Sequence, residues 1–203
     1  MFSGDMRDPE ITINKELAIK AIEYIASFYH EEELIPLHIA DFYQNFQSGE
    51  AVTTMTGVWA TGIWEATDDF SFTALPLPQL FEYPAAHGDS HTLILPIKDE
   101  TSKERELAAL QFLKYAGEQG AIWAEAGHIP TKKDVLESEE FLSLPYRPNY
   151  VEVADKVVFP ETTIYYNAAE TEMIRSLDEI LAGRLTPEEG IERMIHDIEV
   201  IIN

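Results

Sequence analysis

The chain has 203 residues, of which 45% are hydrophobic and 25% are charged, as in a globular protein with a packed core. Its net charge of −23 argues against a nucleic-acid partner, because phosphate binding needs clustered Lys and Arg. The acidity is typical of a solvated surface, and a specific cation site is the alternative. The sequence contains no Cys, which excludes disulfides, zinc–thiolate sites and thiol nucleophiles.

The sequence shows neither a membrane span nor a leader. No run reaches the roughly 18 apolar residues that a spanning helix needs. The first eight residues lack the apolar core of a signal peptide. Two interpretations follow: a cytoplasmic protein, or a fragment whose leader lies elsewhere.

The first part of the chain predicts two helices. Apolar residues recur every three or four positions over 13–29, with Asn14 as the N-cap, which indicates an amphipathic helix. Asp41 precedes a second, short helix. Gly49 follows it at the position where left-handed backbone is favoured, so the helix is expected to end there.

The next part predicts strands. Val and Thr are abundant in 51–56, the apolar residues of 70–74 alternate with polar ones, and 90–97 is largely apolar, so each is expected to be a strand. Residues 58–66, between the first two strands, are expected to form a short helix. Residues 79–89 are expected to be a loop.

The second half predicts mainly helices. A capping box at 101–104 opens a helix, and another at 186–189 opens the last one, which runs to about 201. Further helices are expected at 121–126, after Thr131 and over 163–182, with 143–149 irregular and 150–158 either helix or strand. The helix after 101 has these residues as its expected buried side: Leu107, Leu110, Phe112, Leu113 and Ala116.

Catalytic and metal-binding patterns fit poorly. The sequence has no Gly-x-Ser-x-Gly elbow, no phosphate loop and no His-Glu-x-x-His motif. His87 and His91 are four residues apart, but around a turn rather than on one helix face, which disfavours a metal pair. Glu65 and Asp69 are the best candidates for carboxylates of a glycan-cleaving enzyme.

The aromatic residues are more informative. A sugar ring has an apolar face that stacks on an aromatic ring, while its hydroxyls need polar partners. Trp59 follows a predicted strand end and is interpreted as a ligand platform. Tyr165 and Tyr166, at the start of a helix, are further candidates. Trp64 and Trp123 are interpreted as core residues.

An ordered set of motifs carries a family resemblance. Phe46-x-x-Gly49-x-Ala51-x-x-x-Met55-x-Gly57-x-Trp59 is followed by Pro76-Leu-Pro78, Gly88-Asp-Ser90, an Ala-Ala-x-x-Phe-x-x-Tyr helix ending at Tyr115, and Gly127-x-Ile-Pro130. This order resembles the extracellular solute-binding proteins of bacterial carbohydrate ABC importers, the group that includes maltose-binding protein.

The resemblance implies a helix-rich α/β fold, periplasmic-binding-protein type II-like, with ligand held between two lobes. Such proteins are about twice as long, so the chain resembles their C-terminal half: mainly the C-terminal lobe plus a crossover segment of the N-terminal lobe. It implies this division: 1–86 in the C-terminal lobe, 87–137 in the N-terminal lobe, and 138–203 in the C-terminal lobe again. The crossover segment would then have an apolar face free for self-association, and a homodimer is an expected state.

The resemblance also implies a function. The chain would bind a sugar or oligosaccharide for ATP-driven import, outside the cell or in the periplasm, and deliver it to membrane permease subunits. Binding needs no catalytic residue, cofactor or metal. The alternatives are a polyamine or other non-sugar solute, and an interaction module that has lost transport. The implied ligand-binding residues are Trp59, Gly88, Asp89, Ser90, Tyr165 and Tyr166.

Overall fold

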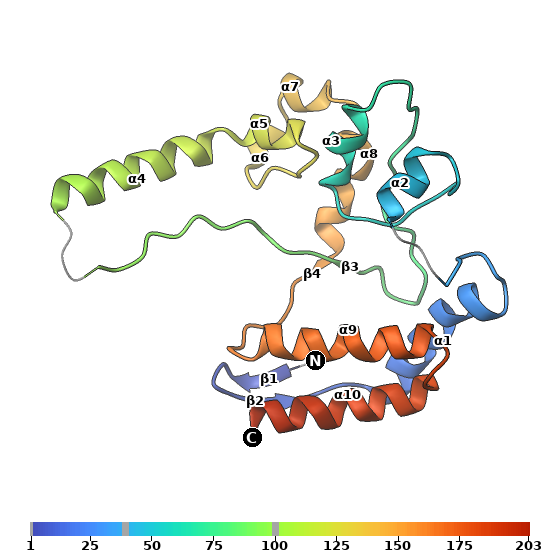
Figure 1. The fold of residues 1–203 in the computed structure, drawn as a ribbon. Helices are drawn as coiled ribbons and strands as arrows, with labels where there is room; N and C mark the ends of the chain where they lie inside the picture. The colour runs from blue at the N-terminus through green and yellow to red at the C-terminus, as the bar shows by residue number, and fades with distance from the viewer. Residues whose placement is uncertain (1, 38–40, 99–101) are drawn as a thin grey trace. The chain divides into compact units, whose positions relative to one another are not determined.

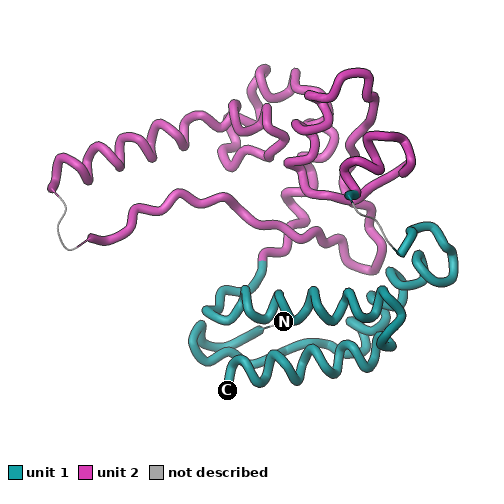
Figure 2. The backbone as a smooth tube through the Cα atoms, viewed as in Figure 1, with its two compact units in different colours: residues 1–41, 160–203 teal, residues 42–159 magenta. Residues whose placement is uncertain are grey.

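The structure is a computed structural model that describes residues 2–37, 41–98 and 102–203. The chain forms two compact units, shown in different colours in Figure 2. Unit 1 comprises residues 1–41 and 160–203, and unit 2 comprises residues 42–159. Unit 1 is thus built from both ends of the chain. The predicted division into lobe segments refers to a larger fold and stays a prediction.

Unit 1 combines a β-hairpin with three helices (Figure 1). Strands β1 (Phe2–Asp5) and β2 (Asp8–Ile11) pair antiparallel, with Phe2 opposite Ile11. The helices are α1 (Lys15–His30), α9 (Tyr166–Leu181) and α10 (Pro187–Ile202). The hairpin was not predicted, because its polar sequence carries no alternating apolar pattern.

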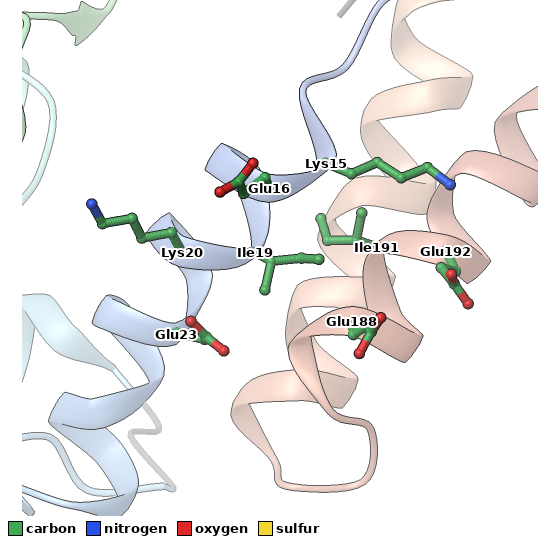
Figure 3. Close-up of a pocket in the computed structure, with 8 residues that line it drawn as sticks. All are labelled: Lys15, Glu16, Ile19, Lys20, Glu23, Glu188, Ile191 and Glu192. Carbon is green, nitrogen blue, oxygen red and sulfur yellow. The ribbon is translucent and has the colours of Figure 1, made fainter.

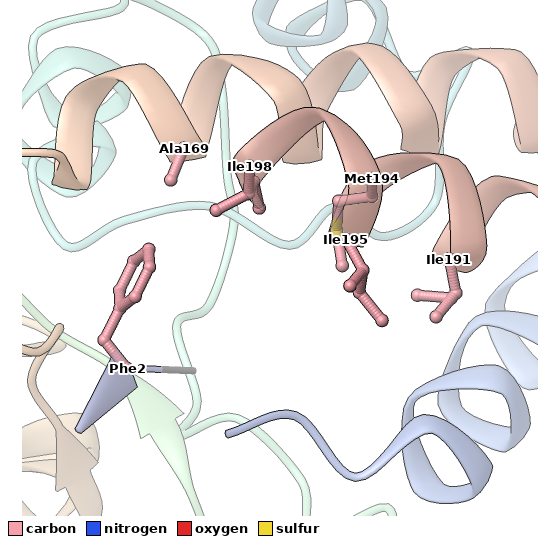
Figure 4. Packing of buried hydrophobic residues seen from close by; sticks show 6 residues of the cluster. All are labelled: Phe2, Ala169, Ile191, Met194, Ile195 and Ile198. Carbon is pink, nitrogen blue, oxygen red and sulfur yellow. The ribbon is translucent and has the colours of Figure 1, made fainter. Parts of the chain in front are cut away.

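The core of unit 1 lies mainly on one face of α10 (Figure 4). Helices α9 and α10 approach closely at Gly190, where an added Cβ would lie 2.3 Å from Ile180. There the Ser176 hydroxyl donates a hydrogen bond of 2.6 Å to the Gly190 carbonyl. The buried apolar cluster consists of Phe2, Ala169, Ile191, Met194, Ile195 and Ile198.

The predicted caps of unit 1 are confirmed. The Asn14 side chain accepts a hydrogen bond of 3.0 Å from the Leu17 backbone. Thr186 and Glu189 form the predicted reciprocal capping box at the start of α10. The backbone and hydroxyl of Thr186 donate hydrogen bonds to the Glu189 carboxylate and lower its pKa.

The regular structure of unit 2 is mainly helical, and its described residues form one very short sheet, the parallel pair of β3 (Ala86–His87) and β4 (Val157–Val158). A 3-10 helix, η1 (Val151–Lys156), precedes β4, so region 150–158 is both helix and strand. Gly49 has a φ of +78°, as its predicted place after the short helix requires. The α-helices are α2 (Phe42–Gln47), α3 (Ala60–Glu65), α4 (Lys103–Glu118), α5 (Gly120–Glu125), α6 (Lys133–Leu136), α7 (Glu139–Leu142) and α8 (Arg147–Tyr150).

Three predicted strands are wrong. Residues 51–56, 70–74 and 90–97 belong to no strand of the structure. A strand needs a neighbour that accepts and donates its backbone hydrogen bonds. The two sheets among the described residues offer no such neighbour to these segments, so their β-like composition does not produce a ladder.

The predicted buried side of α4 is also wrong. None of the sixteen residues of α4 is buried, and Phe112 is 63% exposed. The helix begins after Ser102, whose hydroxyl accepts a hydrogen bond of 3.3 Å from the Arg105 backbone. Thr101, the first residue of the predicted capping box, lies outside the described residues. No described helix of the protein is long and apolar enough to cross a membrane.

Candidate functional site

Trp59 lies at the N-cap position of α3 and is held by two contacts. Its ring lies against Gly57, where an added Cβ would come within 1.9 Å of the indole. Its Nε1 donates a hydrogen bond of 2.7 Å to the hydroxyl of Tyr43 on α2. The side chain is nevertheless 52% exposed. A fixed ring with an accessible surface is the arrangement that stacking of a ligand requires.

Trp64, one turn further along α3, is a core residue as predicted, with 4% exposure. Its ring is surrounded by those of Phe46 at 4.7 Å, Tyr43 at 5.7 Å and Phe72 at 5.8 Å between centroids. Tyr43 therefore contacts both tryptophans. The aromatic core of unit 2 is thereby connected to the exposed ring of Trp59 through Tyr43.

A buried arginine ties α3 to α5 and α8. Arg147 is 1% exposed and forms an ion pair with Glu65 of α3. Its guanidinium donates hydrogen bonds to the backbone carbonyls of Ala124, Glu125 and Pro145. A buried charge is tolerated only with such partners. Glu65, a candidate catalytic carboxylate in the sequence, is thus engaged in holding the fold.

Two glycines let α3 and the end of α5 approach. Gly127 has a φ of +102°, and an added Cβ would lie 2.2 Å from the Val58 carbonyl oxygen. At Gly62, an added Cβ would lie 2.9 Å from the Ala126 carbonyl oxygen. The Tyr150 hydroxyl donates a hydrogen bond of 2.6 Å to the Gly127 carbonyl. Burial raises the pKa of Tyr150, which favours the neutral donor.

The predicted ligand loop 88–90 follows β3. The Gly88 backbone donates a hydrogen bond of 3.3 Å to the Val158 carbonyl, and an added Cβ at Gly88 would strike Val157 at 2.3 Å. The Asp89 carboxylate accepts a hydrogen bond of 2.6 Å from the Ser90 backbone. Asp89 and Ser90 are exposed. Gly88 therefore anchors the loop and leaves two polar side chains accessible.

A third aromatic group lies in unit 2, and the sequence did not indicate it. Trp123 of α5 is 47% exposed, so its prediction as a core residue is wrong. His91 stacks on it at 5.9 Å between centroids, and His128 approaches both rings edge-on. The Ala-Ile-Trp-Ala pattern of α5 suggested packing, but it is Ala124 that is fully buried.

Tyr165 and Tyr166 belong to unit 1, whereas Trp59 and the 88–90 loop belong to unit 2. Both tyrosines are half-buried at the start of α9. The Tyr166 hydroxyl donates a hydrogen bond of 3.1 Å to the Glu170 carboxylate. Their place in the site therefore stays a prediction.

Unit 1 contains a groove of about 490 Å³ between α1 and α10. Ile19 and Ile191 lie between the charged side chains that line it (Figure 3). The lining residues include four Glu and two Lys but no aromatic ring and no predicted site residue. No group of three or more His, Asp or Glu side chains suited to a metal ion occurs among the described residues.

Comparison with known proteins identifies the family. The model of the bacterial extracellular solute-binding protein family matches residues 1–149. The chain belongs to this family. No match was found among curated proteins.

Solved structures of solute-binding proteins share the fold. One is a cyclic alpha-maltosyl-1,6-maltose binding protein from Arthrobacter globiformis, with a TM-score of 0.71 and 20% identity over 91% of this chain and 48% of that chain. Another is the maltose/maltodextrin-binding domain MalE from Bdellovibrio bacteriovorus bound to maltotriose, with a TM-score of 0.70 and 17% identity. The match covers 98% of this chain and 53% of that chain. The chain thus spans about half the length of these solute-binding proteins and has part of the periplasmic-binding-protein fold.

Proposed function

We propose that this solute-binding protein binds a sugar or oligosaccharide for ATP-driven import. The observation that carries the proposal is the indole of Trp59, fixed by Gly57 and Tyr43 yet half exposed. Such a ring can stack on the apolar face of a pyranose without losing side-chain freedom on binding. The two solved structures described above are named for maltose-type sugars, which supports a carbohydrate ligand.

The polar partners of the sugar would come from the ligand loop. Sugar hydroxyls need both donors and acceptors around the stacked ring. Asp89 and Ser90 are exposed and provide a carboxylate and a hydroxyl. Tyr165 and Tyr166 of unit 1 are proposed as further contacts, since each ring is only half-buried.

The partners follow from the family. A solute-binding protein acts outside the cytoplasm, so we place this one in the periplasm or on the cell exterior, where it delivers the sugar to the permease subunits of an ABC importer. The family binds solutes and the best catalytic candidate, Glu65, is paired with buried Arg147, so we propose no enzymatic step. Fractionation of cells that express the intact gene checks the location.

We also propose a homodimer through α4. Its apolar side chains are exposed, and an isolated helix of sixteen residues is marginal in water. The helix carries three basic and three acidic residues, whereas the whole chain has a net charge of −23. Two copies of this acidic protein can therefore meet at α4 without the charge repulsion expected elsewhere on the surface.

Titration calorimetry of the chain tests the proposed ligand class. The panel consists of glucose, maltotriose, xylose, xylotriose and the polyamine spermidine. Binding heat with one or more of the sugars, and none with spermidine, supports the proposal. Binding of spermidine alone would support the alternative of a polyamine ligand. Binding of no member of the panel would favour the alternative of an interaction module.

A further inference from the structure

Trp123, His91 and His128 form an exposed aromatic cluster that the proposed stacking on Trp59 does not use. Single exposed apolar side chains are common on protein surfaces, but a half-exposed tryptophan that contacts two further rings forms a group that can bind a ligand. The three rings come from different segments: the extended chain after Ser90, helix α5 and the turn after Gly127. Centroid separations of 4.9 to 5.9 Å show that they contact one another.

We propose that Trp123, flanked by His91 and His128, binds a second ring of an oligosaccharide whose first ring stacks on Trp59. The inference rests on the proposed sugar-binding function and extends it from a single ring to a chain of at least two. The ligand class is therefore an oligosaccharide rather than a monosaccharide.

The backbone brings this cluster next to Trp59. Val58 and Gly127 are in close contact, since an added Cβ on Gly127 would lie 2.2 Å from the Val58 carbonyl oxygen. Trp59 is the residue after Val58, and His128 is the residue after Gly127. With standard backbone dimensions, the Cα atoms of Trp59 and His128 lie within roughly 10 Å of each other. The cluster and Trp59 therefore lie on neighbouring parts of the backbone of unit 2.

The chemistry of the cluster suits a sugar. A neutral imidazole has one N–H donor and one N acceptor, which are the mixed partners that hydroxyl groups need. Burial, followed by the charge of His91, lowers the pKa of His128, which favours its neutral form. Trp123 adds the apolar ring face, and neither it nor a neutral imidazole repels an uncharged ligand.

Because of the position of Trp123, its replacement can distinguish a binding role from a structural one. Ala124, the next residue, is fully buried and carries the packing of α5 in this region. Replacing half-exposed Trp123 is expected to leave the fold nearly intact, because surface substitutions change stability little. A binding role instead predicts a loss that depends on the length of the sugar.

The test compares a monosaccharide with its trisaccharide by titration of the intact chain. Glucose with maltotriose, and xylose with xylotriose, are the probes, and the variants are Trp123→Ala, Trp123→Phe and Trp59→Ala. We expect Trp123→Ala to weaken trisaccharide binding about tenfold, leave the monosaccharide within about twofold, and be largely rescued by Trp123→Phe. Trp59→Ala should weaken both sugars.

The outcomes distinguish the two proposals. If Trp123→Ala binds the trisaccharide as tightly as the parent while Trp59→Ala does not, the second platform is wrong and the sugar-binding function stands. If the parent binds no sugar, both fail. Should Trp123→Ala be unfolded by circular dichroism, His91→Ala on the exposed extended segment replaces it. A trisaccharide affinity unchanged in His91→Ala, with about threefold weakening expected, would equally overturn the inference.

Discussion

Tyr43 and Trp59, sixteen residues apart in sequence, are joined by a hydrogen bond of 2.7 Å from the indole Nε1 to the phenol oxygen. This contact connects the exposed tryptophan to the aromatic core, because the ring of Tyr43 also contacts buried Trp64. The orientation of Trp59 is thus fixed before a ligand arrives, which reduces the entropy lost on binding.

Tyr43→Phe is expected to weaken sugar binding about threefold. The variant keeps the ring that packs on Trp64 but removes the oxygen that accepts from Trp59, and a hydrogen bond contributes about 1 kcal/mol net. Titration calorimetry measures the affinity, and the free energy of unfolding should fall by about 1 kcal/mol at most. Unchanged affinity would mean that Tyr43 does not position the indole.

Glu65→Gln is expected to reduce the free energy of unfolding by about 2 kcal/mol, because Arg147 is left buried without its counter-charge. Asp69→Asn is the matched control on a nearby carboxylate. Asp69 has a φ of +59°, which Asn tolerates, so little change is expected there. Urea unfolding gives both values, and equal effects in the two variants would contradict the role of the ion pair.

Gly127→Ala is expected to destabilise unit 2 by at least about 2 kcal/mol, because it combines strained backbone with a collision at the Val58 carbonyl. Gly117→Ala is the control: no atom lies within 4 Å of its added Cβ, and it lies in α4, where Ala is favoured by up to about 1 kcal/mol. All three tryptophans belong to unit 2, so their fluorescence reports its unfolding. An unchanged free energy of unfolding in Gly127→Ala would contradict the close approach of Gly127 to the Val58 carbonyl.

Acidification is expected to weaken unit 2 through His128. Its folded pKa lies below the ordinary value of 6.5, so the unfolded chain binds the proton more readily. The stability that this group contributes is present above pH 6.5 and is lost as pH falls below it. His91 is the titratable group that contacts it, and Trp123 adds no charge. His128→Gln should make the decline in unfolding free energy between pH 7 and pH 5 smaller, and an unchanged decline would contradict this.

Phe112→Glu is expected to convert the proposed dimer into a monomer, because it places a charge on the exposed apolar face of α4. Val52→Glu is the control, since Val52 is also an exposed apolar residue, with 91% exposure against 63% for Phe112, but lies outside α4. Size-exclusion chromatography with light scattering gives the masses. A monomeric parent would contradict the proposed homodimer.

Local signals in the sequence predicted local structure well. Asn14, Thr186 with Glu189, and Gly49 each act within one helix turn, so their residue types suffice to place a cap or an end. Trp59 is half exposed, but the strand end that it was predicted to follow is absent, because residues 51–56 form no strand. The strands failed because residues 51–56, 70–74 and 90–97 carry the right residues but find no partner in the described chain.

The long-range contacts could not be predicted from the sequence. Nothing in the spacing of Glu65 and Arg147 indicates an ion pair, and the meeting of His91, Trp123 and His128 depends on how distant segments cross. The close approach at Gly127 could have been suspected from a glycine beside a predicted helix end. Its partner, Val58, could not.

Titration of the parent and of Trp59→Ala with the tightest-binding sugar of the panel measures how much stacking on Trp59 contributes to affinity. We expect measurable binding by the parent, a loss of about tenfold or more in Trp59→Ala, and a much smaller loss in Trp59→Phe, which keeps an aromatic ring. Equal affinity of the parent and Trp59→Ala for that sugar would contradict stacking on Trp59 and, with it, the proposed binding site.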